Sequence, residues 1–133
     1  MAQVETVQQI YEAFGRGDVA AILSKMADAV EWEYGGRAED VPWLHPRQGR
    51  AQVAGFFEAL GALQIHAFTP KTFFSSGAIV VALVDLDATV KATGKRFHEE
   101  DEVHIWHFDS AGRVTRFRHR VDTRKQWEAY GGA

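Results

Sequence analysis

Residues 78–91 have the sequence Ala-Ile-Val-Val-Ala-Leu-Val-Asp-Leu-Asp-Ala-Thr-Val-Lys. Every second position in this stretch is apolar, namely Val80, Ala82, Val84, Leu86, Ala88 and Val90. The intervening positions become polar toward the end, at Asp85, Asp87 and Lys91. A hydrophobic period of two predicts a β-strand with one buried face and one face toward solvent.

Clusters of turn-forming residues bound this strand and its neighbours. They are Ser75-Ser76-Gly77, Thr93-Gly94-Lys95 and Asp109-Ser110-Ala111-Gly112. Such clusters divide residues 64–123 into four long strands, which short turns would join as an antiparallel meander. A shorter alternating segment at residues 30–34 predicts one more strand earlier in the chain.

The first half of the chain has the period of helices instead. Apolar residues recur at steps of three and four, at Val4, Val7, Tyr11 and Phe14 and again at Val53, Phe56, Phe57 and Leu60. Asp18 is a suitable N-cap for a helix between these two, and a last short helix is expected after Asp122. Helices followed by a meander predict a single α+β domain over residues 1–133, with the helices on one face of a curved antiparallel sheet.

Composition excludes several function classes. The 133 residues carry a net charge of −3, so nothing favours binding to nucleic acid or to an anionic membrane. There is no cysteine, which excludes disulfides and thiol chemistry. The longest apolar run, residues 78–84, is far shorter than the roughly 20 residues of a membrane span. The N-terminus lacks the pattern of a secretory signal, so a cytoplasmic protein is expected.

Several segments together resemble the nuclear transport factor 2-like superfamily, in its SnoaL-like polyketide cyclase and ketosteroid isomerase-like branches. They are Gly17-Asp18-Val19 through Met26-Ala27-Asp28, Gly49-Arg50, and Trp106-His107-Phe108-Asp109-Ser110-Ala111-Gly112-Arg113-Val114 leading to Val121-Asp122-Thr123. The resemblance implies a cone-shaped sheet with three N-terminal helices on its concave face, enclosing an apolar pocket. It also implies a homodimer formed through the outer face of the sheet.

The resemblance places the steroid isomerase's catalytic positions on residues of a different chemistry. Its general-base aspartate corresponds to Tyr34, its oxyanion tyrosine falls near Ile10, one residue from Tyr11, and its protonated aspartate corresponds to His104. These differences argue against classical ketosteroid isomerase activity. The catalytic aspartate of the SnoaL-like cyclases corresponds to His119, an imidazole that can still transfer protons near neutral pH.

The last hairpin carries most of the polar candidates. Glu100, Glu102, His104 and Trp106 alternate along one strand and Phe117, His119 and Val121 along the next. A two-residue loop would pair Phe108 with Arg113, and so place Glu102 opposite His119 and His104 opposite Phe117. A bulge at Gly112 would instead turn one of the two sets to the other face.

In the first register, His119 is the expected acid/base, Glu102 the carboxylate that orients it, and His104 a hydrogen-bond donor. The expected walls of a ligand pocket are aromatic: Trp32, Tyr34, Trp106, Phe117 and Tyr11. Each of these side chains would equally suit plain core packing. No metal site and no cofactor are expected, because His104 and His107 point to opposite faces of a strand.

Three functions fit these observations. The first is a cofactor-independent acid/base enzyme, of the isomerase, cyclase or hydrolase type, acting on a small apolar molecule that is cyclic or polyketide-like. The second is a domain that binds an apolar ligand without changing it. The third is an association domain that uses the face of its sheet.

Overall fold

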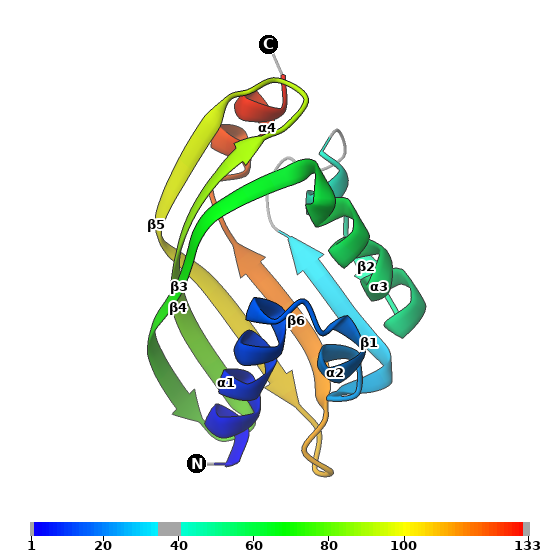
Figure 1. Cartoon of the computed structure of the whole chain (residues 1–133). Helices are drawn as coiled ribbons and strands as arrows, with labels where there is room; N and C mark the ends of the chain where they lie inside the picture. Colours follow the sequence, from blue (N-terminus) through cyan, green and yellow to red (C-terminus); the bar gives the residue numbers. More distant parts are fainter. Residues whose placement is uncertain (1, 35–40, 132–133) are drawn as a thin grey trace.

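A computed structural model describes residues 2–34 and 41–131, except for the side chain of Tyr34. The described residues form one six-stranded sheet in the order β2-β1-β6-β5-β4-β3 (Figure 1). Its strands are β1 (Met26–Tyr34), β2 (Arg47–Gln48), β3 (Leu63–Ser76), β4 (Ile79–Val90), β5 (Arg96–Phe108) and β6 (Val114–Arg120). The four long strands expected between residues 64 and 123 are thus confirmed.

One strand pair differs from the expected antiparallel sheet. β1 runs parallel to β6, whereas the other pairs are antiparallel. A parallel pair needs a long connection between its strands, and here most of the chain lies between β1 and β6. The parallel contact brings Trp32 beside Phe117 in the centre of the molecule.

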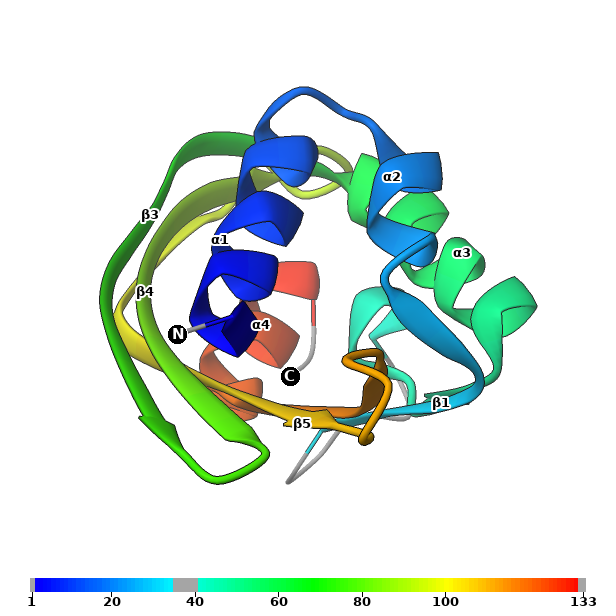
Figure 2. The ribbon, with the colours of Figure 1, turned by 90° about the horizontal axis from the view of Figure 1, so that it is seen from below.

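The helices lie inside the curve of the sheet and across its open side. They are α1 (Ala2–Gly15), α2 (Val19–Leu23), η1 (Pro42–Leu44), α3 (Arg50–Ala59), η2 (Leu60–Ala62) and α4 (Thr123–Tyr130). Figure 2 shows the sheet wrapped around α1, with α2 and α3 facing its open side. The expected α+β architecture, with three N-terminal helices against a curved sheet, is therefore confirmed. None of the described helices has the length and apolar composition that a membrane span needs.

The predicted helix caps form as expected. The Asp18 side chain accepts a hydrogen bond from the backbone N–H of Ala21, which starts α2. Asp122 accepts one from the N–H of Lys125 in the same way and starts α4. Because such caps satisfy free amides of the first turn, they set where each short helix begins.

A β-bulge in β5 changes which residues face the interior. Val84 pairs with Glu102 and Leu86 with Glu99, so Asp85 alone lies opposite two residues, Glu100 and Asp101. Asp101 adopts a left-handed conformation, with φ of 59°. Its backbone N–H donates to Asp85, and Lys71 bridges the Asp85 and Asp101 carboxylates at 2.8 and 2.6 Å.

The bulge corrects one expectation. Glu100 is exposed rather than on the face of Glu102, because the extra residue shifts the alternation of β5 by one position. Glu99 and Glu102 therefore both point inward and are each 5% exposed.

The register of the last hairpin also differs from the expected one. His104 lies opposite His119 and Trp106 opposite Phe117, two positions away from the predicted pairs. The loop spans residues 109–113 and is closed by the Asp109 carboxylate, which accepts from the N–H groups of Ala111 and Arg113. Because a shift of two positions keeps the same face, the predicted inward set stays together although its partners change.

Candidate functional site

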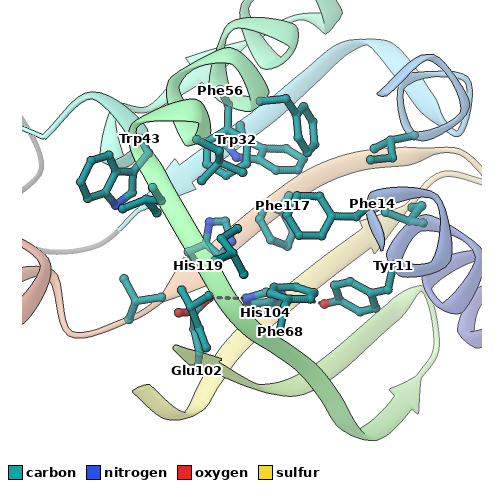
Figure 3. A pocket seen from close by; sticks show the side chains of 18 of the residues that line it. Tyr11, Phe14, Trp32, Trp43, Phe56, Phe68, Glu102, His104, Phe117 and His119 are labelled. Carbon is teal, nitrogen blue, oxygen red and sulfur yellow. Dashed lines mark hydrogen bonds and ion pairs between the residues drawn. The ribbon is translucent and has the colours of Figure 1, made fainter. Parts of the chain in front are cut away.

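A cavity of about 70 Å³ lies between the inner face of the sheet and α1, α3 and α4. Its walls are largely aromatic. Trp32, Trp106, Phe117 and Tyr11, four of the five aromatic residues expected to line a pocket, all contribute to it. The fifth, Tyr34, has a side chain outside the described residues. The three polar residues singled out from the sequence, Glu102, His104 and His119, line the same cavity (Figure 3).

Glu102 contacts His104 rather than standing opposite His119. The Glu102 Oε1 and His104 Nε2 atoms are 2.6 Å apart, and both side chains are buried. The two residues lie two positions apart on β5, so the alternation of one strand brings them to the same side. The expected cross-strand pair of Glu102 and His119 is thus wrong, because His119 lies opposite His104.

Tyr11 extends this contact into a chain of hydrogen bonds. Its hydroxyl lies 2.7 Å from His104 Nδ1 and accepts a hydrogen bond of 3.1 Å from Trp106 Nε1. An ionised carboxylate can only accept, so the proton between Glu102 and His104 belongs to His104 Nε2; in a neutral imidazole Nδ1 is then the acceptor, and the Tyr11 hydroxyl donates to it. His104 then carries its proton on Nε2 and donates it to Glu102. The chain therefore runs in one direction, from Trp106 through Tyr11 and His104 to the carboxylate.

Burial keeps the hydroxyl of Tyr11 protonated. Desolvation raises the pKa of Tyr11 far above its usual range, and the charge of Glu102 raises that pKa further. The hydrogen bond from Trp106 acts in the opposite direction and does not offset the burial. Tyr11 is thus a hydrogen-bond donor at every pH at which the protein would be used.

His119 lies beside the chain. Its ring stands perpendicular to that of His104, with 4.5 Å between the ring centroids. Burial, followed by the neighbouring His104, lowers the pKa of His119 well below its usual value. His119 is accordingly a neutral imidazole near pH 7, with one ring nitrogen as a donor and the other as an acceptor.

One carboxylate oxygen of Glu102 has no hydrogen-bond partner among the described residues. Oε1 is bonded to His104, whereas Oε2 is buried and has no hydrogen-bond partner among the described residues. A buried polar atom without a partner costs roughly 1–3 kcal/mol, so its retention calls for an explanation. A carboxylate oxygen in this position can accept a hydrogen bond from a bound molecule.

The same three side chains are the nearest approach to a cation site in the described part of the chain. Ligand atoms of Glu102, His104 and His119 lie within 4.8 Å of one another. Glu102 Oε1 and His104 Nε2, at 2.6 Å, lie closer together than two ligands of a tetrahedral zinc, whose bonds are each about 2.0–2.2 Å long. Because His104 Nε2 is hydrogen-bonded to Glu102, a metal ion could bind there only if that hydrogen bond broke.

A second buried carboxylate was not identified from the sequence. Glu99 accepts hydrogen bonds from the backbone of Asp122 and from the side chain of Gln126, which in turn accepts one of 2.7 Å from Trp43. Burial raises the pKa of Glu99 to about 7. The alternation of β5 predicts an exposed Glu99, and only the bulge at Asp101 turns it inward.

The cone of sheet around α1, with an apolar cavity and a polar cluster on its inner face, defines the nuclear transport factor 2-like fold. Residues 7–117 match the model of the SnoaL-like domain family. Because this match spans most of the sequence, the chain belongs to the SnoaL-like family.

Solved structures share this fold over the whole chain. A nuclear transport factor 2-like protein of unknown function from Burkholderia pseudomallei K96243 is 25% identical, with a TM-score of 0.86 and coverage of 99% of both chains. A protein from Mesorhizobium loti, provisionally named a SnoaL-like polyketide cyclase, is 21% identical, with a TM-score of 0.72 and coverage of 90% of this chain and 98% of that one. One from Rhodopseudomonas palustris, provisionally named an isomerase, is 17% identical, with a TM-score of 0.74 and coverage of 98% and 97%. No curated protein sequence matches the chain.

Proposed function

We propose that this protein is an acid/base enzyme, of the isomerase, cyclase or hydrolase type, that acts on a small apolar molecule without a cofactor. The observation that carries the proposal is the one-way hydrogen-bond chain from Trp106 to Glu102. It ends on a carboxylate with one uncommitted oxygen at an apolar cavity. Solved structures of the same fold that are provisionally named isomerase or polyketide cyclase are consistent with this chemistry.

In this proposal Glu102 is the general base. Its Oε2 accepts a proton from an acidic C–H of the substrate, or from a water that attacks it, while His104 holds Oε1 in place. A positioned base of this kind contributes typically 10²–10⁴-fold to a rate. Tyr11 fixes the tautomer of His104, because its O–H occupies Nδ1 and leaves the proton on Nε2.

His119 takes the role of hydrogen-bond donor rather than that of principal base. A neutral imidazole can donate its N–H to an oxygen of the substrate on which negative charge develops. These roles differ from the sequence hypothesis, in which His119 was the acid/base, Glu102 oriented it and His104 was the hydrogen-bond donor. The physical reason is the register of the hairpin, which places Glu102 in contact with His104.

Exchange of C–H protons for deuterium tests the proposal directly. The probe is 2-octanone, a ketone with acidic C–H groups beside its carbonyl, incubated in D₂O and followed by proton NMR. We expect exchange above the protein-free rate with the wild type and its loss in Glu102→Gln. The matched control is His98→Gln, an exposed position on the same strand, which is expected to keep the wild-type rate.

A second candidate function is supported by the cavity itself. Its volume of about 70 Å³ is well below the roughly 300–1,000 Å³ of typical ligand pockets, which suits an apolar binding site that opens around its ligand. Binding of 2-octanone without exchange in the wild type would exclude proton transfer from this ketone and favour binding without catalysis.

We also propose that the protein forms a homodimer through the outer face of the sheet. Apolar side chains on that face support the proposal. Phe74 and Ile79 are 55% and 37% exposed, and Val81, Leu83, Val103 and Ile105 are half-buried. Arg116, bonded to Glu33 at 2.5 Å, borders them with a charged pair that could face its equivalent in a second copy.

A further inference from the structure

A second pocket of about 220 Å³ adjoins the inner cavity on the side of α2 and η2. The two share Phe14, Ile22, Phe57, Leu60 and Ile65 as lining residues. The two spaces are therefore adjacent and share part of a wall made by residues of α1, α2, α3, η2 and β3. This second pocket, called the outer pocket below, is completed by Gly17, Val19 and Gly61.

Aromatic rings form the wall between the two spaces. The Phe14 and Phe57 ring centroids are 6.2 Å apart, and Phe14 lies 4.8 Å from Phe68. All three rings are half-buried rather than locked in the core. Figure 3 shows Phe14 and Tyr11 reaching inward from α1 above the sheet. Rotation of such rings about their side-chain torsions can open the wall while the backbone keeps its place.

The two spaces differ in chemistry. The inner one holds Glu102, His104 and His119, whereas the residues that line the outer one are apolar or glycine. The inner volume of about 70 Å³ is well below the roughly 300–1,000 Å³ of typical ligand pockets. Joined to the outer pocket, it approaches the lower end of the usual range for ligand pockets, roughly 300 Å³.

From these dimensions we infer that the ligand is amphipathic and elongated: a carbonyl-bearing head beside Glu102 and an unbranched apolar tail that passes between Phe14 and Phe57 into the outer pocket. The position of the head rests on the proposed function, and the tail subsite rests on the shared wall alone. The substrate class is therefore ketones and related acyl compounds with a chain of several methylenes, rather than compact fused rings.

Gly61 offers a way to block the outer pocket alone. A Cβ built at Gly61 would meet no atom within 4 Å, and its backbone is not in the left-handed region. Gly61 lines the outer pocket and not the inner cavity, so Gly61→Trp introduces a large side chain at the outer pocket from a position whose Cβ has room. Gly15→Trp is the matched control, because Gly15 is equally open and lines neither space.

The experiment is calorimetric titration of the three proteins with 2-alkanones from 2-pentanone to 2-decanone. For the wild type and Gly15→Trp we expect affinity to rise about fourfold for each added methylene, the value for burial of one CH₂. For Gly61→Trp we expect the same affinity for the shortest ketones and no further rise once the tail reaches the blocked pocket.

Three results would overturn the inference. They are no binding of any alkanone, no increase in affinity with tail length in the wild type, or the same increase in affinity per methylene in Gly61→Trp as in the wild type. Because the readout is binding, it is separate from the exchange test of catalysis. Loss of the chain-length effect in Gly61→Trp would establish the tail subsite even in a protein without exchange activity. If exchange is found but Gly61→Trp gains as much affinity per methylene as the wild type, the enzyme proposal stands and the tail subsite is excluded.

Discussion

Glu102 and His104, two positions apart on β5, are joined inside the molecule by a hydrogen bond of 2.6 Å. The pair is thus built within one strand, whereas the neighbouring strand supplies His119 beside it. Tyr11, from the other end of the chain, fixes the orientation of the His104 ring. The position of the carboxylate therefore depends on contacts among three elements, α1, β5 and β6.

The carboxylate of Glu102 should be sensitive to its exact position. In Glu102→Asp the acid group is kept but is drawn back by one methylene from both His104 and the cavity. We expect a fall in the exchange rate on the order of 10²-fold, since a displacement of about 1 Å can cost that much. The rate is measured by proton NMR in D₂O, with circular dichroism to verify the fold. A rate in Glu102→Asp equal to that of the wild type would argue that this carboxylate is not the base.

Loss of the Tyr11 hydroxyl should cost stability. Tyr11→Phe removes the hydroxyl that bonds both Trp106 Nε1 and His104 Nδ1, and leaves two buried nitrogens without this partner. We expect the free energy of unfolding to fall by about 1–3 kcal/mol, as measured by denaturant titration. Tyr130→Phe is the control, because no hydrogen bond of the Tyr130 hydroxyl is found among the described residues, and it should change little. Equal stability of the two variants would refute the chain of hydrogen bonds.

Glu99 should make the folded state less stable as pH rises. Its pKa is about 7 in the folded protein because of burial, against roughly 4.3 for an unfolded chain. Between these values the folded state binds more protons than the unfolded state, so the free energy of unfolding falls with increasing pH. The stabilisation is complete below about pH 4 and is lost through pH 7, with a total on the order of 1–3 kcal/mol.

Denaturant titrations of the wild type and Glu99→Gln at pH 5 and pH 8 measure this effect. The wild type should lose more stability between the two values than the variant, which has no charge to bury. The comparison cancels the contribution of other groups that titrate in both proteins. If both proteins lose the same amount, Glu99 is not the group responsible.

The proposed dimer predicts a change in molecular mass. Ile105 lies on the outer face of β5 between Val81 and Arg118 on the adjoining strands. A charge in the centre of an apolar interface is costly, so Ile105→Glu should yield single chains where light scattering of the wild type gives twice the mass of one. Thr115→Glu, at the bulged edge of β6, should leave the mass unchanged. A wild type with the mass of one chain would disprove the dimer.

The alternation of apolar residues placed Glu102, His104 and Trp106 on one face of β5 and Phe117 and His119 on one face of β6, but a possible bulge in the hairpin left open whether the two faces coincide. It was not sufficient to pair them. The register depends on Asp109, whose carboxylate closes a loop of five residues, and on the extra residue Thr115 in β6. Such a loop and such a bulge have no strong signature in sequence, because many residues tolerate both.

The sequence by itself determined the α+β class, the four long strands, and the helix caps at Asp18 and Asp122. These features follow from local periodicity and from side chains that bond to their own neighbouring backbone. Tertiary structure alone decided that Glu102 bonds to His104, that Tyr11 completes the chain, and that Glu99 is buried. Each of these contacts depends on the bulge at Asp101, on the hairpin register or on the docking of α1. Such contacts join segments that are distant in sequence, so they form only when the whole sheet closes around α1.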